Sequence, residues 1–346
     1  MLQAGIIGLG RIGIGFISDP NRGLASTHVG SYKLVDGVEL ISACDSNPAV
    51  LYQDCKELRL LNLYQDMAEM MWDGCGDLEI ISICTPPDQH LACVQAAVAG
   101  GARAIFLEKP IADTYETGQH IVELCERKGV ALLVDHQRRF SPLHRAASGY
   151  VLTGKMGRIQ GGWAWYTAGL FNSGTHLINL LSLYLGNAYW VRGRPSVNPS
   201  WKEDDPNIDA LVRFMSGPEI TIHGFDHKHY ADFGFTIWGT EGKLETTNNG
   251  MGLLYWEARE SAVFSGYNEL YPASLPVRGV KETDRLIPLG IEMLRDYLEE
   301  ETPLDVSGRD ALATLKVLEA IKLSATKGGV ICLDPLEQSP GQATPS

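Results

Sequence analysis

The sequence predicts an α/β protein of two domains: a doubly wound parallel sheet, then an α+β domain with a mostly antiparallel, open-faced sheet. The chain has 346 residues, more than one hydrophobic core usually organises. Short apolar runs alternate with helical patterns in the first third, whereas the later part has strand patterns separated by Gly, Pro and Asp turn signals. We therefore place the domains at residues 1–137 and 138–335, followed by a solvated tail at 336–346.

The first domain is predicted from strands that are apolar on both faces. The strand-length runs are 2–7, 38–44, 78–84, 104–107 and 131–134. Helical patterns with a period of about 3.6 residues lie at 48–58, 88–99 and 115–128. Strands of this kind need helices on both faces of their sheet, which is typical of a parallel sheet built from βαβ units.

The second domain begins where this alternation stops. Ser141 and Pro142 are typical of an N-cap followed by the first helical position, so a helix is expected to about residue 152. Further helices are predicted at 174–185, 284–300 and 308–327, the last two closing this domain. The predicted strands are 189–192, 209–215, 220–225, 233–238 and 243–246. Segments 198–207 and 251–280 are expected to be loops that shape a pocket.

Composition excludes several classes of protein. The net charge of −13 repels phosphate backbones and anionic lipid heads, so neither nucleic acid nor a membrane is an expected partner. The seven cysteines are odd in number and show neither a CxxC pair nor zinc-ligand spacing, which indicates a reducing compartment and no metal site. With no signal-peptide core and no apolar run of about 18 residues, a cytoplasmic location is expected.

A G-x-G-x-x-G motif, formed by Gly8, Gly10 and Gly13, follows the first predicted strand at the start of a helix. The first glycine permits a tight turn, the second lets the backbone approach a pyrophosphate, and the third lets helix and strand pack closely. Backbone N–H groups around Arg11 and Ile12 would attract the anion. A glycine-rich turn without a ligand is the plain alternative, but the position within a βαβ series favours a Rossmann-type dinucleotide site.

Asp45 ends the second predicted strand, where a carboxylate can accept both adenosine ribose hydroxyls and repel a 2′-phosphate. This favours NAD over NADP, although an ordinary turn aspartate would look the same. Asp36 is nearer the usual spacing, but it precedes the strand and reads as a turn residue. Asp45 lies 45 − 13 = 32 residues after Gly13, against about 20 usually, and the excess falls in a loop near 18–23 that interrupts the first helix.

More specific motifs lie at the ends of the next two strands. The segment 84–90 reads CTPPDQH, and 108–110 reads Glu-Lys-Pro. With these motifs the chain resembles the family of glucose-fructose oxidoreductase, inositol dehydrogenase and rhizopine-catabolism proteins (Gfo/Idh/MocA). Further stretches that carry the resemblance are 135–140, 154–157, 239–242 and 317–321.

The resemblance implies an NAD(P)-dependent dehydrogenase of sugars, inositols or related polyols, with its site between the two domains. Lys109 would hydrogen-bond the reacting oxygen, where an ammonium stabilises alkoxide character. A cis peptide bond is expected before Pro110. The cofactor contacts implied are Thr85, Pro86, His90, Glu108 and Lys109.

A second catalytic element resembles the motif D-x-G-x-H. The matching positions in this chain are Asn172, Gly174 and His176. His176 is expected to be the general acid/base, because imidazole titrates near neutral pH. Asn172 departs from the family aspartate and can only orient substrate through hydrogen bonds. Asparagine there resembles members that oxidise nucleotide-linked sugars at the 3-position.

Polar and aromatic residues near these motifs suit a pyranose, which stacks on rings and binds through its hydroxyls. Ordinary sheet packing would place the same residue types there. The expected substrate contacts are His136, Arg138, Trp163, Tyr166, Asn172 and Thr175.

The leading hypothesis is hydride transfer between NAD and a ring hydroxyl carbon of a sugar, nucleotide sugar or inositol-like polyol. The alternative is an NAD-assisted glycosidase or epimerase of the same superfamily, with the cofactor recycled in place. A dinucleotide-binding sensor is a third reading, disfavoured by the presence of both Lys109 and His176.

A homodimer or homotetramer is expected through the open face of the C-terminal sheet. The residues expected to be buried against the partner subunit are Ile220, Ile222, Phe233, Phe235 and Ile237.

Overall fold

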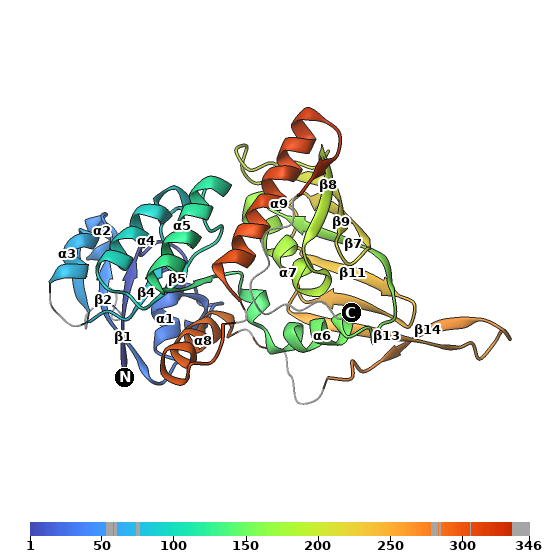
Figure 1. Ribbon diagram of the computed structural model, residues 1–346, viewed down its shortest axis with the longest axis horizontal. Helices are drawn as coiled ribbons and strands as arrows, with labels where there is room; N and C mark the ends of the chain where they lie inside the picture. The colour runs from blue at the N-terminus through green and yellow to red at the C-terminus, as the bar shows by residue number, and fades with distance from the viewer. Residues whose placement is uncertain are drawn as a thin grey trace. The chain divides into compact units, whose positions relative to one another are not determined.

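The computed structural model divides into two compact units (Figure 1). It describes residues 1–52, 58, 61–73, 77–277, 283, 285–304 and 306–333. Within these residues, the first unit takes Met1–Phe140 with Asp284–Leu312, and the second takes Ser141–Thr283 and the chain from Ala313 onward. The predicted tail lies outside the described residues, as do two of the seven cysteines, Cys55 and Cys75.

The first unit is built on a six-stranded parallel sheet in the order β3-β2-β1-β4-β5-β6, which confirms the predicted fold class. Its strands are β1 (Leu2–Ile7), β2 (Val38–Cys44), β3 (Asn62–Tyr64), β4 (Ile80–Ile83), β5 (Ala104–Leu107) and β6 (Ala131–Val134). The strand order reverses between β1 and β4, and ligands of such sheets bind at this switch point, beyond the carboxyl ends of the strands. The short edge strand β3 was not predicted.

Helices cover both faces of this sheet, α3, α4 and α5 on one and α1 and α8 on the other (Figure 1). Their bounds are α1 (His28–Tyr32), α2 (Pro48–Leu51), α3 (Met67–Trp72), α4 (His90–Ala99), α5 (Tyr115–Lys128) and α8 (Leu286–Glu300). The predicted helix at 48–58 has only its first turn, α2, among the described residues.

The long first helix of a usual βαβ unit is broken in this chain. After the glycine motif the backbone forms two short 3₁₀ turns, η1 (Gly15–Ser18) and η2 (Leu24–Ser26), before α1 begins. Thr27 caps α1 by accepting a hydrogen bond from the Gly30 N–H at 3.1 Å. The interruption agrees with the loop expected near 18–23.

Helix α8 packs in the first unit, not in the C-terminal domain to which the sequence analysis assigned it. Its Ile287, Ile291 and Leu294 share a core with Phe106 and Leu133 of the parallel sheet. The apolar stripe of α8 predicted an amphipathic helix correctly, but such a stripe does not say which apolar surface will cover it. The predicted C-terminal domain, 138–335, therefore contains a segment, 285–312, that belongs to the first unit.

The second unit contains a nine-stranded sheet in the order β14-β13-β12-β11-β7-β10-β9-β8-β15, in which β10 and β7 pair in parallel and the other pairs are antiparallel. The strands are β7 (Ile159–Thr167), β8 (Ala188–Pro195), β9 (Ile208–Phe214), β10 (Glu219–Phe225), β11 (Gly234–Gly239), β12 (Gly242–Thr247), β13 (Gly252–Glu260), β14 (Asn268–Ala273) and β15 (Ile331–Cys332). The loop expected at 251–280 is therefore wrong for most of its length, because it contains the hairpin of β13 and β14.

Three helices lie on one face of this sheet: α6 (Pro142–Leu152), α7 (Thr175–Leu185) and α9 (Gly308–Lys327) (Figure 1). Ser141 accepts a hydrogen bond from the His144 N–H, which confirms the expected N-cap of α6.

The core between the sheet and these helices corrects the expected interface. It contains Ile220, Ile222, Phe233, Phe235 and Ile237, each at most 3% exposed. These residues are therefore buried inside the unit and not available to a partner subunit.

Candidate active site

The glycine motif has the geometry that its three positions require. Gly8 has φ +95°, and a Cβ on it would lie 2.7 Å from the carbonyl carbon of Cys84. A Cβ on Gly13 would collide with the carbonyl oxygen of Gly8. By contrast, beyond the two chain neighbours of Gly10, no described atom lies within 4 Å of where a Cβ on this glycine would stand. The second glycine thus borders open space, as a turn that admits a pyrophosphate needs.

Asp45 lies directly beside this turn. Its Oδ2 accepts a hydrogen bond from the Leu9 N–H at 2.7 Å, and its Oδ1 accepts one from the Asn47 N–H at 2.8 Å. Each carboxylate oxygen has two acceptor positions, so these bonds leave acceptor capacity for ribose hydroxyls. The residues around the turn fit an adenine dinucleotide.

Lys109 follows β5 at the same edge of the sheet. The Lys109–Pro110 peptide bond is cis, as the resemblance implied. Because parallel strands share the direction of their carboxyl ends, the loop after β5 and the glycine turn after β1 emerge at one edge. The structure thus brings the predicted lysine and the predicted cofactor turn to the same side of the first unit.

The carboxylate of Glu108, a predicted cofactor contact, is hydrogen-bonded inside the protein. Its Oε1 lies 3.1 Å from Nε2 of the completely buried His28. The other ring nitrogen of His28 lies 3.1 Å from the Ser82 hydroxyl, and the Tyr32 hydroxyl lies 2.8 Å from that same oxygen. This network holds the side chain of Glu108, the residue before Lys109.

Asp135 completes a buried cluster with His28 and Glu108, whose ligand-type atoms all lie within 4.8 Å of one another. Burial raises the pKa of Glu108, but the hydrogen bond from His28 and the charges of His28 and Lys109 outweigh it, so that pKa lies below its ordinary value. Burial and then the negative charge of Glu108 raise the pKa of Asp135 well above its ordinary value. The two shifts have opposite signs, so Asp135 binds a proton more readily than Glu108 does.

Sequence reasoning missed the roles of His28, Ser82 and Asp135, since the bonded residues are far apart in the chain. His28 and Glu108 are separated by 80 positions, and His28 and Ser82 by 54. The only local signal was Asp135 following a strand that ends at the same sheet edge.

The side chain of His90 is hydrogen-bonded to the loop after β4. Its ring nitrogens lie 2.9 Å from the Thr85 carbonyl oxygen and 3.1 Å from the Ile111 carbonyl oxygen, and the side chain is completely buried. Burial lowers the pKa of His90. His90 thus joins the loop of Thr85 and Pro86 to the loop after Pro110, and its predicted direct contact with the cofactor is not compatible with this burial.

His136 and Arg138 follow β6 at the edge that carries Lys109. Burial, with the positive charges of Lys109 and Arg139, lowers the pKa of His136 to about 3, so this imidazole is neutral near pH 7. Its side chain is only 3% exposed. Burial also lowers the pKa of Arg138 to about 10, opposed by the charge of Asp135.

In the second unit, Asn172 and His176 lie about one turn apart on a continuous helical segment. Asn172 belongs to a π-helical turn, η5 (Leu170–Gly174), which runs into α7, and His176 is the second residue of α7. Both side chains are partly exposed, whereas Thr175 is 1% exposed and faces the interior. π-helical turns inside helices are frequent at functional sites.

Tyr166, a predicted substrate contact, is contradicted by its burial, and Trp163, another, lies on the opposite face of the same strand. Tyr166 is completely buried, and its hydroxyl donates to the Ile208 carbonyl at 2.9 Å and accepts from the Ile208 N–H at 2.8 Å. Trp163 pairs in register with Thr221 and Thr236, on the face opposite its neighbour Ala164, which packs in the core with residues of α7. Because side chains alternate along a strand, Trp163 faces away from the helix that carries His176.

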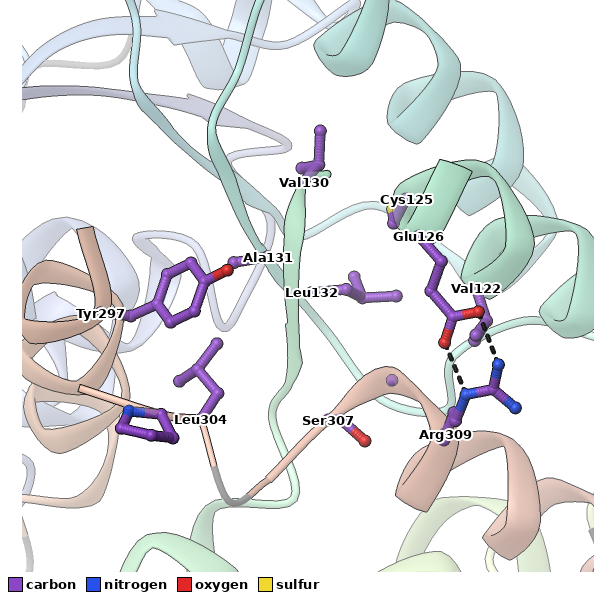
Figure 2. A pocket seen from close by; sticks show the side chains of 12 residues that line it. Val122, Cys125, Glu126, Val130, Ala131, Leu132, Tyr297, Leu304, Ser307 and Arg309 are labelled. Carbon is purple, nitrogen blue, oxygen red and sulfur yellow. Dashed lines mark hydrogen bonds and ion pairs between the residues drawn. The ribbon is translucent and has the colours of Figure 1, made fainter. Parts of the chain in front are cut away.

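A cavity of about 300 Å³ lies elsewhere in the first unit (Figure 2). It is mostly apolar, and the Glu126 carboxylate and the Arg309 guanidinium form a two-bond ion pair at its side, with both N–O distances 2.6 Å. Its lining residues are Val122, Cys125, Glu126, Val130, Ala131, Leu132, Tyr297, Pro303, Leu304, Ser307, Gly308 and Arg309. None of the predicted site residues lines it.

Comparison with known proteins finds a family match in the N-terminal part of the chain. Residues 2–136 match the profile of a family described as "Oxidoreductase family, NAD-binding Rossmann fold" (Gfo/Idh/MocA). D-apiose dehydrogenase of Paraburkholderia graminis is 24% identical over 94% of this chain and 89% of its own length. Inositol 2-dehydrogenase of Pseudomonas syringae is 33% identical over 45% of this chain, which covers 43% of that relative.

Two solved structures share the fold over nearly the whole chain. Levoglucosan dehydrogenase, in complex with NADH and L-sorbose, superposes with a TM-score of 0.78 at 18% identity, covering 97% of this chain and 99% of that one. The WlbA dehydrogenase of Bordetella pertussis, in complex with NADH and UDP-GlcNAcA, gives 0.74 at 21% identity with the same coverage. Among the helices the structure describes, none is both long enough and apolar enough to cross a membrane.

Proposed function

Because residues 2–136 of this chain belong to the Gfo/Idh/MocA oxidoreductase family, we propose that the protein transfers a hydride between NAD and a ring hydroxyl carbon of a sugar, nucleotide sugar or inositol-like polyol. One observation carries the proposal: Lys109 follows β5 at the sheet edge where the open glycine turn follows β1. The named activities of D-apiose and inositol dehydrogenases support the substrate class.

NAD is the proposed cofactor, in preference to NADP. Asp45 presents a carboxylate beside the glycine turn, held by the N–H groups of Leu9 and Asn47. A carboxylate there accepts the ribose hydroxyls of NAD and repels the 2′-phosphate of NADP. The bound dinucleotide supplies the hydride acceptor or donor.

The chain's own residues handle the oxygen and its proton. Lys109 donates a hydrogen bond to the reacting oxygen and stabilises its negative character as the carbinol is oxidised. His176 takes the hydroxyl proton as general base in that direction and returns it as general acid in the other. Asn172 orients the substrate, since its amide can donate and accept hydrogen bonds but carries no charge. His136 and Arg138 are proposed as further substrate contacts from the loop after β6.

The test is a panel of free, phosphorylated and nucleotide-linked sugars and inositols, each incubated with NAD or NADP while reduced cofactor is followed by absorbance. The proposal expects net NADH formation with at least one member and less with NADP. Sugar turnover without added cofactor and without net NADH would instead support an NAD-assisted epimerase or glycosidase. Dinucleotide binding with no turnover of any sugar would support a sensor and would reject both enzymatic proposals.

A further inference from the structure

Four consecutive backbone N–H groups at the start of the helix that carries Asn172 are all bonded to one tripeptide. The Phe171 and Asn172 N–H groups donate to Oδ1 and Oδ2 of Asp205, at 2.8 and 2.9 Å. The preceding residue, Leu170, donates to the Pro206 carbonyl at 3.3 Å. The first of the four, Gly169, donates to Oδ1 of Asn207 at 3.1 Å. These are the donors that a helix leaves unsatisfied at its N-terminus. We call residues 205–207 the clamp.

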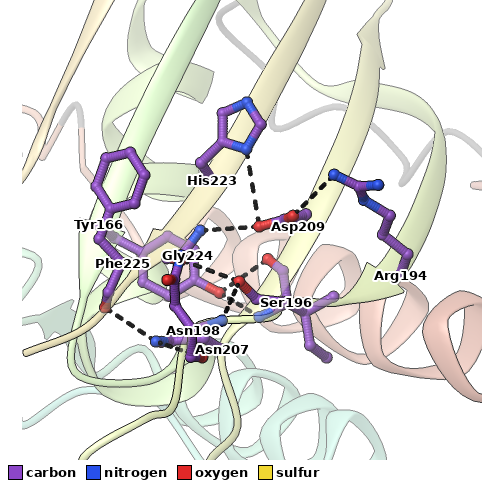
Figure 3. Close-up of polar contacts among 10 residues, drawn as sticks. Tyr166, Arg194, Ser196, Asn198, Asn207, Asp209, His223, Gly224 and Phe225 are labelled. Carbon is purple, nitrogen blue, oxygen red and sulfur yellow. Dashed lines mark hydrogen bonds and ion pairs between the residues drawn. The ribbon is translucent and has the colours of Figure 1, made fainter.

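The clamp is itself anchored to the sheet of the second unit. The buried Asn207 side chain donates through Nδ2 to the carbonyl oxygen of Phe225 at 2.9 Å (Figure 3). It also donates to the carbonyl oxygen of Pro199 at 3.0 Å, so its amide bridges β10, the loop after β8 and Gly169. The fit is close, because a Cβ on Gly224 would lie 2.7 Å from Cβ of Asn207. Asn207 therefore cannot move without disturbing β10.

The segment that the clamp holds departs from regular backbone. Ala168 has φ +66°, in the left-handed region that favours glycine, and Gly169 has φ +96°. A Cβ on Gly169 would collide with Oδ2 of Asp205, so the approach of the carboxylate depends on glycine at this position. The next five residues form the π-helical turn. Such conformations persist only where the surroundings hold them in place.

The side chain of Asn172 belongs to the same assembly, since its Nδ2 donates to the Ala168 carbonyl at 3.1 Å. Its backbone N–H is fixed by Asp205. The backbone N–H of Asn172 is thus bonded to the clamp and its side-chain amide to the strained turn. Asn172 lies one helical turn before His176.

We infer that Asp205, with Asn207 behind it, is a positioning residue that sets the place of Asn172, and through the helix that of His176, for the reaction. This inference rests on the proposed function. It extends the site to a segment, 198–207, that carries none of the motifs of the resemblance and that the sequence analysis treated only as a pocket loop.

The first arm of the test needs no substrate. Amide hydrogen exchange at Phe171 and Asn172 should be slow in the wild-type protein and at least about tenfold faster in Asp205→Ala. In Asp205→Asn, which keeps one acceptor oxygen, exchange should lie between the two. The matched control is Asp204→Asn, which removes the same charge from the exposed neighbouring residue and should leave both amides unchanged. Equal exchange in all four proteins overturns the inference whatever their activity.

The second arm uses the sugar identified by the panel. Asp205→Ala should lower kcat by about 10²-fold, as small misplacements of catalytic groups do, while the KM for NAD stays unchanged, and Asp205→Asn should restore part of the loss. If Asp205 acts through Asn172, its substitution should cost less in an Asn172→Ala background than in the wild type. Equal losses in both backgrounds, or faster exchange with unchanged kcat, would overturn the positioning role. A wild-type protein inactive on every sugar would reject the proposed function instead.

Discussion

Lys109 is the residue on which the proposed chemistry depends most, because it is the cation that follows β5 at the same sheet edge as the glycine turn. Lys109→Met keeps the length of the side chain and removes the donor. We expect kcat to fall by about 10²- to 10³-fold, as for loss of one donor to a developing oxyanion, with NAD affinity nearly unchanged. Lys128→Met, at the exposed end of α5, is the control. Wild-type kcat in Lys109→Met would remove this residue from the mechanism.

Asp45 tests the choice of cofactor. Asp45→Ser should lower the preference for NAD over NADP by about tenfold to hundredfold, because it removes a charged acceptor for the ribose hydroxyls. The ratio of kcat/KM for the two cofactors is the measurement. Asp36→Ser removes the same charge from an exposed residue just before β2 and should leave the ratio unchanged. A ratio that moves equally in both variants would contradict a specific role for Asp45.

Asp135 gives a prediction about pH. The raised pKa of Asp135 means that the folded protein holds a proton which the unfolded chain releases above about pH 3.9, so this group lowers stability as pH rises. Asp135→Asn places a neutral isostere there and should be more stable than the wild type near pH 7, with the difference shrinking toward pH 4. Thermal unfolding across this range measures it. A variant that is less stable at pH 7 than at pH 4, relative to wild type, would show that Asp135 is ionised.

At the scale of elements, the placement of α8 can be tested through a glycine. A Cβ on Gly290 would lie 2.6 Å from Cζ of Phe106, so Gly290→Ala should destabilise the first unit by about 1–3 kcal/mol through overpacking. The matched change Gly149→Ala lies on the exposed face of α6, where an added Cβ would meet no described atom within 4 Å beyond its chain neighbours and its own helix backbone. It should stabilise its helix by about 0.5–1 kcal/mol. Midpoints of unfolding with opposite shifts are expected, and a neutral Gly290→Ala would contradict the packing of α8 against β5.

The elements themselves were predictable where the signal was local. Strands β1, β2, β5 and β6 begin and end as their apolar runs predicted. The hairpin of β13 and β14 was missed because only Gly252 and Tyr255 of its strand residues are buried, so no alternation of buried and polar positions marks the two strands. The packing of α8 on the parallel sheet was not predicted, because the apolar stripe of a helix does not determine which sheet the helix covers.

The same distinction applies to the site. Motifs contiguous in sequence predicted the glycine turn, Asp45 beside it and the cis bond at Lys109. The bonds of Glu108 to His28 and of Asp205 to Asn172 join residues 80 and 33 positions apart, and no spacing in the sequence marks them. Tyr166 was misjudged because an aromatic residue in a strand has the same pattern whether it faces a ligand or the core.

For the whole molecule, self-association through the outer face of the nine-stranded sheet remains a prediction, now with different residues. Trp163 is 42% exposed, Trp238 36% and Leu254 48% on strands of that sheet. Light scattering at micromolar concentration should give a dimer or tetramer, and the double variant Trp163→Lys, Leu254→Lys should lower the mass. Tyr230→Lys, an exposed aromatic residue outside the strands, is the control. A monomeric wild-type protein would refute the prediction.

The most direct test of hydride transfer follows a single hydrogen atom. The sugar identified by the panel is prepared with deuterium on its ring carbinol carbons and mixed with the protein and NAD in ordinary water, and the nicotinamide is then analysed by mass spectrometry. We expect deuterium in the reduced nicotinamide of the wild-type reaction and about 10²- to 10³-fold slower transfer with Lys109→Met. Sugar turnover that leaves no deuterium on the nicotinamide would contradict the proposed reaction.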